Sequence, residues 1–100
     1  MIVRFTPPAR AQLIAAVGFI RGERPSAALS FRAWVGEALA QLATFPESGP
    51  VIPEFPTFDF RQLLVDSYRV FYTVRGDVVW IVGVWRDAQM PDEPQDPGGG

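Results

Sequence analysis

Apolar and polar side chains alternate most regularly between residues 59 and 75. Within residues 68–75, one set of alternate positions carries Tyr68, Val70, Tyr72 and Val74. The positions between them carry Arg69, Phe71, Thr73 and Arg75. A period of two is typical of a strand that buries one face. We therefore expect strands at 59–65 and 68–75, joined by a tight turn at Asp66-Ser67.

Residues 78–85 carry no charge over eight positions, which predicts a strand that is covered on both of its faces. Gly76-Asp77 supplies the turn that joins this strand to the one before it. Gly83 lies inside the strand. A glycine there indicates either a bulge or a close approach of another group to the backbone.

Two other stretches have the period of a helix. The first begins at Thr6-Pro7, a capping residue followed by a residue suited to the first helical position, and ends near Gly22. Its apolar stripe consists of Leu13, Val17 and Ile20. The second is opened by Pro25 and covers residues 27–44, with a stripe of Ala28, Phe31, Val35, Leu39 and Leu42. So short a connection predicts an antiparallel helix hairpin.

Residues 45–58 contain four prolines, which exclude a helix or a central strand there. With a short strand at Ile2–Phe5, the elements follow the order β-α-α-β-β-β. The sequence therefore predicts an α+β fold, in which a helix hairpin packs on one face of a small, largely antiparallel sheet. We expect a single domain over residues 1–91 and a disordered acidic Pro/Gly tail over residues 92–100.

The composition excludes several kinds of chemistry. The chain has no cysteine, histidine or lysine, so it cannot form a Ser-His-Asp triad, a Cys-His pair, a lysine Schiff base or a zinc site of the usual ligands. We expect no metal and no other cofactor. The net charge of -2 argues against a general nucleic-acid coat but leaves a local arginine patch open. No apolar stretch is long enough to span a membrane, and we expect a cytoplasmic protein.

Several short motifs occur in an order and spacing that are familiar from one family. Pro25–Ala28 and Leu42–Gly49 are similar to the entry and exit of that family's second helix. Arg61–Leu64 and Tyr68–Tyr72 match its central strands. Val84–Pro91 is similar to the ending Val-Trp-His-Gly-Ala-Arg-Asp-Pro of one branch. On these residues the chain resembles the RelE/ParE superfamily of small bacterial toxins, and its ending favours the ParE-like branch.

The resemblance implies the toxin of a bacterial type II toxin–antitoxin pair, neutralised by a cognate antitoxin of the ribbon-helix-helix or helix-turn-helix type. ParE-like toxins bind a protein, with DNA gyrase as the precedent, so the resemblance favours a binding protein over an enzyme. One alternative is a ribosome-dependent mRNA endoribonuclease of the RelE type. The other is a degenerate, non-toxic member that only binds its antitoxin.

For a ribonuclease, the resemblance points to Glu54 as the base and to Arg61 and Arg69 as the phosphate-binding residues. Such chemistry needs a base near the 2′-hydroxyl and positive charge on the phosphate. Arg86 or Asp87 stands where these enzymes often carry a histidine or tyrosine as the acid. An arginine on a sheet face also has a structural alternative, which is an ion pair with a nearby carboxylate.

For a protein-binding toxin, the candidate target or partner contacts are Arg61, Arg69, Trp85 and Arg86. The candidate antitoxin-binding side chains are Phe55, Phe58 and Phe60, which lie close together near the expected edge of the sheet. Their alternative role is closure of the core. We expect an antitoxin helix to dock on the helix hairpin and an antitoxin strand to add to the sheet edge.

Overall fold

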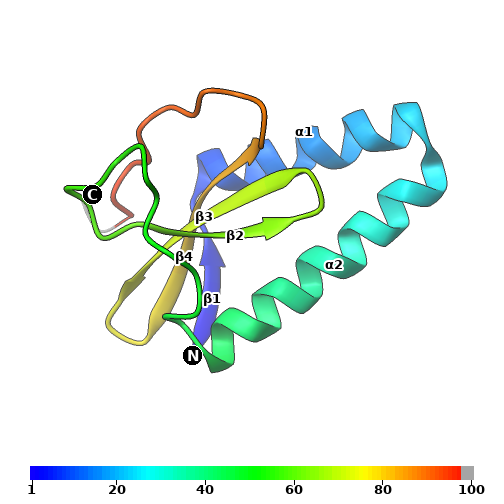
Figure 1. The fold of residues 1–100 in the computed structure, drawn as a ribbon. Coiled ribbons are helices and arrows are strands. Elements are labelled where there is room, and N and C mark those ends of the chain that lie inside the picture. The colour runs from blue at the N-terminus through cyan, green and yellow to red at the C-terminus, as the bar shows by residue number, and fades with distance from the viewer. Residues whose placement is uncertain (98–100) are drawn as a thin grey trace.

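Two helices lie side by side over one face of a four-stranded sheet (Figure 1). The structure is a computed structural model that describes residues 1–97. Its elements are β1 (Ile2–Phe5), α1 (Pro7–Glu23), α2 (Pro25–Thr44), β2 (Arg61–Val65), β3 (Tyr68–Arg75) and β4 (Val78–Arg86). The strand order is β1-β4-β3-β2, with β1 parallel to β4 and the other pairs antiparallel. The predicted α+β fold and element order are confirmed.

A single residue, Arg24, joins the two helices. Thr6 caps α1, because its side-chain oxygen accepts a hydrogen bond of 3.3 Å from the Ala9 amide. The Arg24 amide still bonds to the Ile20 carbonyl, and Pro25 then opens α2 with a backbone angle suited to the first helical position. The helices run antiparallel, as predicted (Figure 1). No helix among residues 1–97 is long and apolar enough to cross a membrane.

The helices and the sheet share one cluster of buried side chains, which we call the helix-side core. The sheet contributes Tyr68, Val70, Tyr72, Val79, Ile81 and Val84, and the helices contribute Ala9, Ala16, Phe31, Val35 and Leu42. The rings of Phe31 and Tyr68 pack at 5.1 Å between centroids, which ties α2 to the start of β3. The apolar face predicted for residues 68–75 is therefore the face that the helices cover.

Residues 45–60 and the C-terminal segment run over the opposite side of the sheet (Figure 1). The buried residues there are Ile52, Phe60, Phe71 and Val82, with Phe55, Trp80 and Trp85 packed against them. We call this cluster the loop-side core. Strand β4 contributes to both cores, so it is covered on both faces, as its lack of charge predicted.

A β-bulge allows β4 to serve both cores. Phe71 lies opposite Gly83 while Tyr72 lies opposite Ile81, which leaves Val82 as the extra residue. The backbone at Gly83 is closely approached, because a Cβ there would lie 3.2 Å from the Phe71 ring and from the Trp85 indole, so that one of these side chains would have to shift. Both the bulge and the close approach predicted at Gly83 are present.

The predicted tail begins against the loop-side core. Pro91 and Pro94 are buried, and the Asp96 carboxylate lies 3.2 Å from the Arg75 guanidinium. Disorder of the tail stays a prediction, and residues 98–100 lie outside the described residues.

Gly49 fixes the loop that leaves α2. Its amide donates a hydrogen bond of 2.9 Å to the Tyr72 hydroxyl, and its carbonyl accepts one of 2.8 Å from Arg61. A Cβ on Gly49 would overlap the carbonyl oxygen of Gln62 in β2 and would lie 2.9 Å from the Tyr72 hydroxyl. The glycine of the exit motif is therefore required by close packing of two backbone segments.

Gly49→Ala is expected to lower the free energy of unfolding by about 2–4 kcal/mol, because the added methyl group overlaps backbone that β2 holds in place. Gly36→Ala is the matched control. Gly36 is exposed in α2 with open space around it, so alanine should stabilise the helix by up to about 1 kcal/mol. Urea unfolding followed by circular dichroism measures both. A Gly49→Ala chain as stable as its parent would contradict the prediction.

Candidate interaction surfaces

Arg69 lies on the loop-side face of the sheet and is almost fully buried, with 6% of its surface exposed. Its guanidinium forms a two-pronged ion pair with Glu54, with nitrogen–oxygen distances of 2.6 and 2.7 Å. Its Nε donates a further bond of 2.7 Å to Gln62, and the group lies 4.9 Å above the ring centroid of Phe71. Each of the three guanidinium nitrogens thus has a hydrogen-bond partner, and the Phe71 ring packs against the group.

The electrostatics of the pair follow from these contacts. The hydrogen bonds from Arg69 lower the pKa of Glu54 more than burial raises it. The same contact with Glu54 is the main reason that the pKa of Arg69 is raised. Both groups are therefore held in their charged forms. The ion pair fastens residues 53–55 of the loop onto the sheet.

Arg61 lies on the other face of the sheet. It is paired across the strands with Tyr72, whose side chain belongs to the helix-side core, and directly opposed residues point to the same face. Its guanidinium donates to the carbonyls of Gly49 and Glu47 at 2.8 and 3.4 Å. The structure therefore brings Glu54 and Arg69 together but not Arg61, although the ribonuclease hypothesis needs all three at one phosphate.

The three candidate phenylalanines occupy different environments. Phe60 is 2% exposed and belongs to the loop-side core, and Phe55 is half-buried against that core. Phe58 is 41% exposed and stacks on Phe60 with 5.5 Å between ring centroids. Phe60 therefore helps to close the core, which is the structural alternative that the sequence offered for these side chains. Phe58 is the member of the set with a ring open to a partner.

Trp85 and Arg86 end β4, and they differ in exposure. Trp85 is half-buried against the loop-side core, whereas Arg86 is exposed, with its guanidinium 4.8 Å above the ring centroid of Phe19 in α1. Beside this pair lies a groove of about 400 Å³, between α1 and the adjacent ends of β3 and β4. We call it the Arg86 groove. Sequence reasoning identified Arg86 but not Phe19 or Tyr68, which also line the groove, because nothing in their local pattern distinguishes them from core residues.

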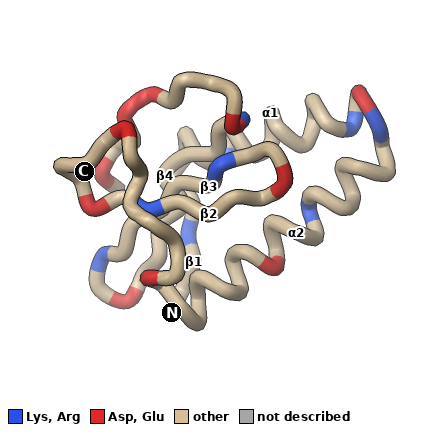
Figure 2. The backbone as a smooth tube through the Cα atoms, viewed as in Figure 1, with Lys and Arg blue, Asp and Glu red and all other residues tan. Residues whose placement is uncertain are grey.

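Charge is divided unevenly over the molecule (Figure 2). Residues 1–45 hold five arginines and two glutamates, while residues 46–100 hold four arginines and nine acidic residues. In the part of the chain that the structure describes, ion pairs involve Arg69 and Arg75 and none of the five arginines of residues 1–45. The hairpin side therefore presents unpaired positive charge to solvent.

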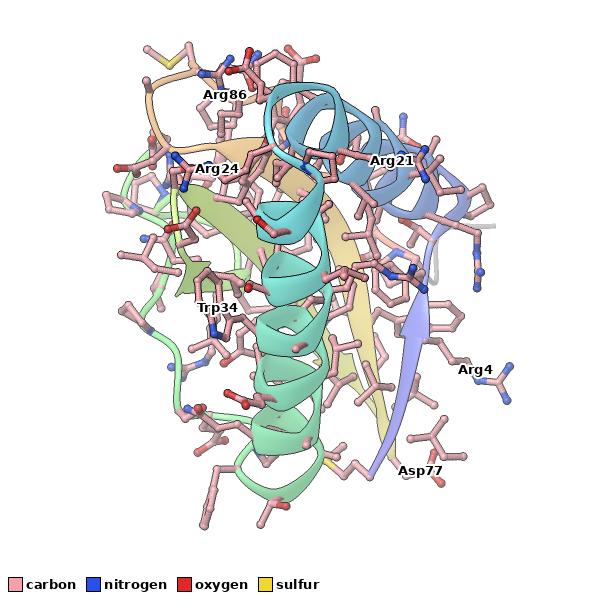
Figure 3. The ribbon with its side chains drawn as sticks, turned by 90° about the vertical axis from the view of Figure 1, so that its right-hand side faces the viewer. Arg4, Arg21, Arg24, Trp34, Asp77 and Arg86 are labelled. Carbon is pink, nitrogen blue, oxygen red and sulfur yellow. The ribbon has the colours of Figure 1, made fainter. Side chains whose placement is uncertain are left out.

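The hairpin also exposes large apolar side chains between these arginines. They are Ile14 and Phe19 on α1, and Leu29 and Trp34 on α2. In Figure 3, Trp34 lies along the side of α2, and Arg21, Arg24 and Arg86 lie in the upper part of the view. Mixed apolar and arginine character of this kind is typical of protein-binding surfaces.

With a helix hairpin packed on a four-stranded sheet, the chain is a small α+β protein. The fold is similar to the solved structure described as "Chromosomal ParDE TA system from P. aeruginosa", with a TM-score of 0.68. The two chains are 20% identical, and the match covers 86% of this chain and 95% of that chain. At this identity the likeness carries the fold alone.

Residues 3–91 match the family described as "ParE toxin of type II toxin-antitoxin system, parDE". The chain belongs to this family of toxins, and the ParE-like resemblance predicted from its motifs is confirmed. No curated protein sequence matches the chain.

The Glu54–Arg69 pair should make stability depend on pH with a defined sign. Because the pKa of Glu54 is below its ordinary value of 4.5 in the folded chain, the pair's stabilisation is complete above pH 4.5. It is lost as the pH falls through the folded pKa. Glu54→Gln should therefore be about 1–2 kcal/mol less stable than its parent near neutral pH, and this difference should shrink in acid.

Urea unfolding at neutral and acidic pH measures the effect. Asp77→Asn is the matched control, because it removes one exposed carboxylate that makes no ion pair with any residue in 1–97. It should change stability by less than about 0.5 kcal/mol. A Glu54→Gln chain that loses the same stability at every pH would contradict the predicted role of the pair.

Proposed function

We propose that this toxin arrests growth by binding a protein target, with DNA gyrase as the family's precedent, and that a cognate antitoxin neutralises it. One observation carries the proposal. The polar residues that a ribonuclease would need for its reaction are already bonded to other groups of the protein. Glu54 is bonded to Arg69, and Arg61 holds a loop on the opposite face of the sheet. The hairpin meanwhile exposes unpaired arginines among apolar side chains, which suits contact with a protein.

The four candidate target contacts then divide into two roles. Arg61 and Arg69 act through the shape of the loop, because each holds a different part of residues 47–54. Trp85 supports the end of β4, and Arg86 is the residue exposed for direct contact. A change at Arg61 or Arg69 should therefore alter binding by moving the loop rather than by removing charge from a phosphate.

The antitoxin has a free strand edge available on β2. The Gln62 amide donates to the Pro50 carbonyl at 2.9 Å, which covers the first part of the outer edge. Beyond that point residues 63–65 have no outer partner strand within residues 1–97, and Leu64 is 65% exposed there. A hollow of about 280 Å³ lies between this edge and Trp34 of α2. An antitoxin strand that adds to β2 would bring a side chain to this hollow.

Induced expression of the chain without its antitoxin tests the proposed mechanism. DNA supercoiling, filamentation and translation are followed together, first for the parent chain and then for Glu54→Gln. We expect growth arrest with filamentation and DNA damage while translation continues. Glu54→Gln should retain this effect, because its carboxylate is not assigned to any reaction.

Other results would give a different function. Prompt loss of protein synthesis with cleaved mRNA, abolished in a folded Glu54→Gln chain, would replace the proposal with the ribosome-dependent endoribonuclease. Absence of growth arrest from a folded parent chain would indicate a non-toxic member that only binds its antitoxin.

Leu64→Asp should weaken antitoxin binding by about tenfold or more, because it places a charge at the edge where the added strand would lie. Leu29→Asp is the matched control, since Leu29 is equally exposed but lies on α2. It should weaken antitoxin binding less than Leu64→Asp does, because it lies away from the edge where the strand adds. Calorimetric titration with the purified cognate antitoxin measures both. If Leu29→Asp weakened antitoxin binding more than Leu64→Asp did, the main antitoxin contact would lie on the hairpin.

A further inference from the structure

The Arg86 groove combines an apolar wall with polar groups that have unused hydrogen-bonding capacity. Ala15, Ala16 and Phe19 of α1 form one side, and Val84 lies on the side of the sheet. Trp85 also lines the groove, and the remaining four residues have polar ends, namely Gln12, Tyr68, Arg86 and Gln89. None of the lining residues is acidic.

Tyr68 aims a hydroxyl group into the groove. Only 4% of this residue is exposed, and no hydrogen bond to its hydroxyl is present among the described residues. Among residues 1–97, no fully enclosed side-chain nitrogen or oxygen lacks a partner. The hydroxyl must therefore open to the groove, because the rest of the ring is packed against Phe31 and the sheet.

Two glutamines present donors to the same space. The Gln12 carbonyl oxygen accepts a bond of 2.8 Å from the Val84 amide, and the Gln89 carbonyl oxygen accepts one of 3.2 Å from the Arg86 amide. Because backbone N–H groups can only donate, these bonds fix the oxygen end of each side chain. The NH₂ groups of both side chains are left as donors.

Arg86 supplies the charge. Its guanidinium lies over Phe19 and makes no ion pair with any residue that the structure describes. The next residue, Asp87, acts electrostatically on Arg69 on the opposite face of the sheet. The groove therefore offers an unneutralised guanidinium with a tyrosine hydroxyl and two amide donors, which is the complement of a carboxylate.

We infer that the Arg86 groove binds a segment of the antitoxin in which an aspartate or glutamate is next to a large apolar residue. The carboxylate meets Arg86 and Tyr68, while the apolar side chain packs on Ala15, Ala16 and Phe19. This inference rests on the proposed function, because it requires neutralisation by an antitoxin.

Position in the fold favours the antitoxin as the occupant. Tyr68 of the groove and Val65 at the free edge of β2 flank the same two-residue turn and are paired across the strands. An extended chain that adds to β2 thus passes the end of the sheet where the groove opens. The junction of α1 and α2, which carries Arg21 and Arg24, lies on the side toward which the β2–β3 turn points, so approach of an acidic segment is favoured (Figure 1).

The test uses the full chain and the purified cognate antitoxin. Arg86→Gln should weaken binding by about tenfold or more, because it leaves a carboxylate of the antitoxin without its charged partner. Arg32→Gln is the matched control, since Arg32 is exposed on α2 and also makes no ion pair with a described residue. It should change the affinity by less than about threefold. Ala15→Trp fills the groove and should weaken binding as Arg86→Gln does.

A double-mutant cycle gives the sharper result. Each aspartate and glutamate of the antitoxin is changed to its amide, and the affinity for each toxin variant is measured. One of these changes should weaken binding to the Arg32→Gln chain but not to the Arg86→Gln chain.

Each contrary outcome has its own meaning. Parent-like antitoxin affinity for both Arg86→Gln and Ala15→Trp would overturn the inference and leave the proposed function standing. Loss of growth arrest in Arg86→Gln with unchanged antitoxin affinity would assign the groove to the target instead, and so overturn it as well. A parent chain that binds no antitoxin would overturn the proposed neutralisation together with the inference.

Discussion

The structure depends on covering both faces of the β3–β4 strand pair. β4 has no charged side chain before Arg86, and Phe71 of β3 points away from the helices. The helix hairpin buries one face by the pattern of its apolar stripes alone. The other face is covered by a proline-rich segment without regular structure, which is joined to the sheet by an isolated β-bridge between Val51 and Arg61 rather than by a longer ladder. Specific side-chain contacts must therefore fasten that segment.

Those contacts determine which polar residues are left for function. Arg61 and Tyr72 hold the loop at Gly49, and Arg69 holds it at Glu54. The two arginines that first attract attention in the sequence thus act on the two faces of the sheet and maintain its cover. The arginines without an ion pair among residues 1–97, apart from Arg61, lie on β1, on the hairpin and at the end of β4.

This division is consistent with a toxin that acts through its surface. In the proposal, an acidic partner meets the arginines of the hairpin side, a strand adds to the uncovered part of β2, and the Arg86 groove takes a carboxylate beside that edge. The three features lie on elements that the two cores hold firmly. Binding would then need little ordering of the toxin itself, which favours affinity.

The sequence by itself determined the order of elements, the turns at Asp66-Ser67 and Gly76-Asp77, the buried face of β3 and the membership of a ParE-like family. The elements, the turns and the buried face follow from local periodicity, capping and turn chemistry, which act over a few residues, whereas the family follows from the resemblance of its motifs. Only the tertiary structure decided that Arg61 and Arg69 lie on opposite faces, that Glu54 pairs with Arg69, that Phe60 is core, and that Tyr68 opens to a groove. Each of these depends on strand register or on contacts between residues far apart in the chain, and no local pattern encodes which of several nearby partners a side chain will meet.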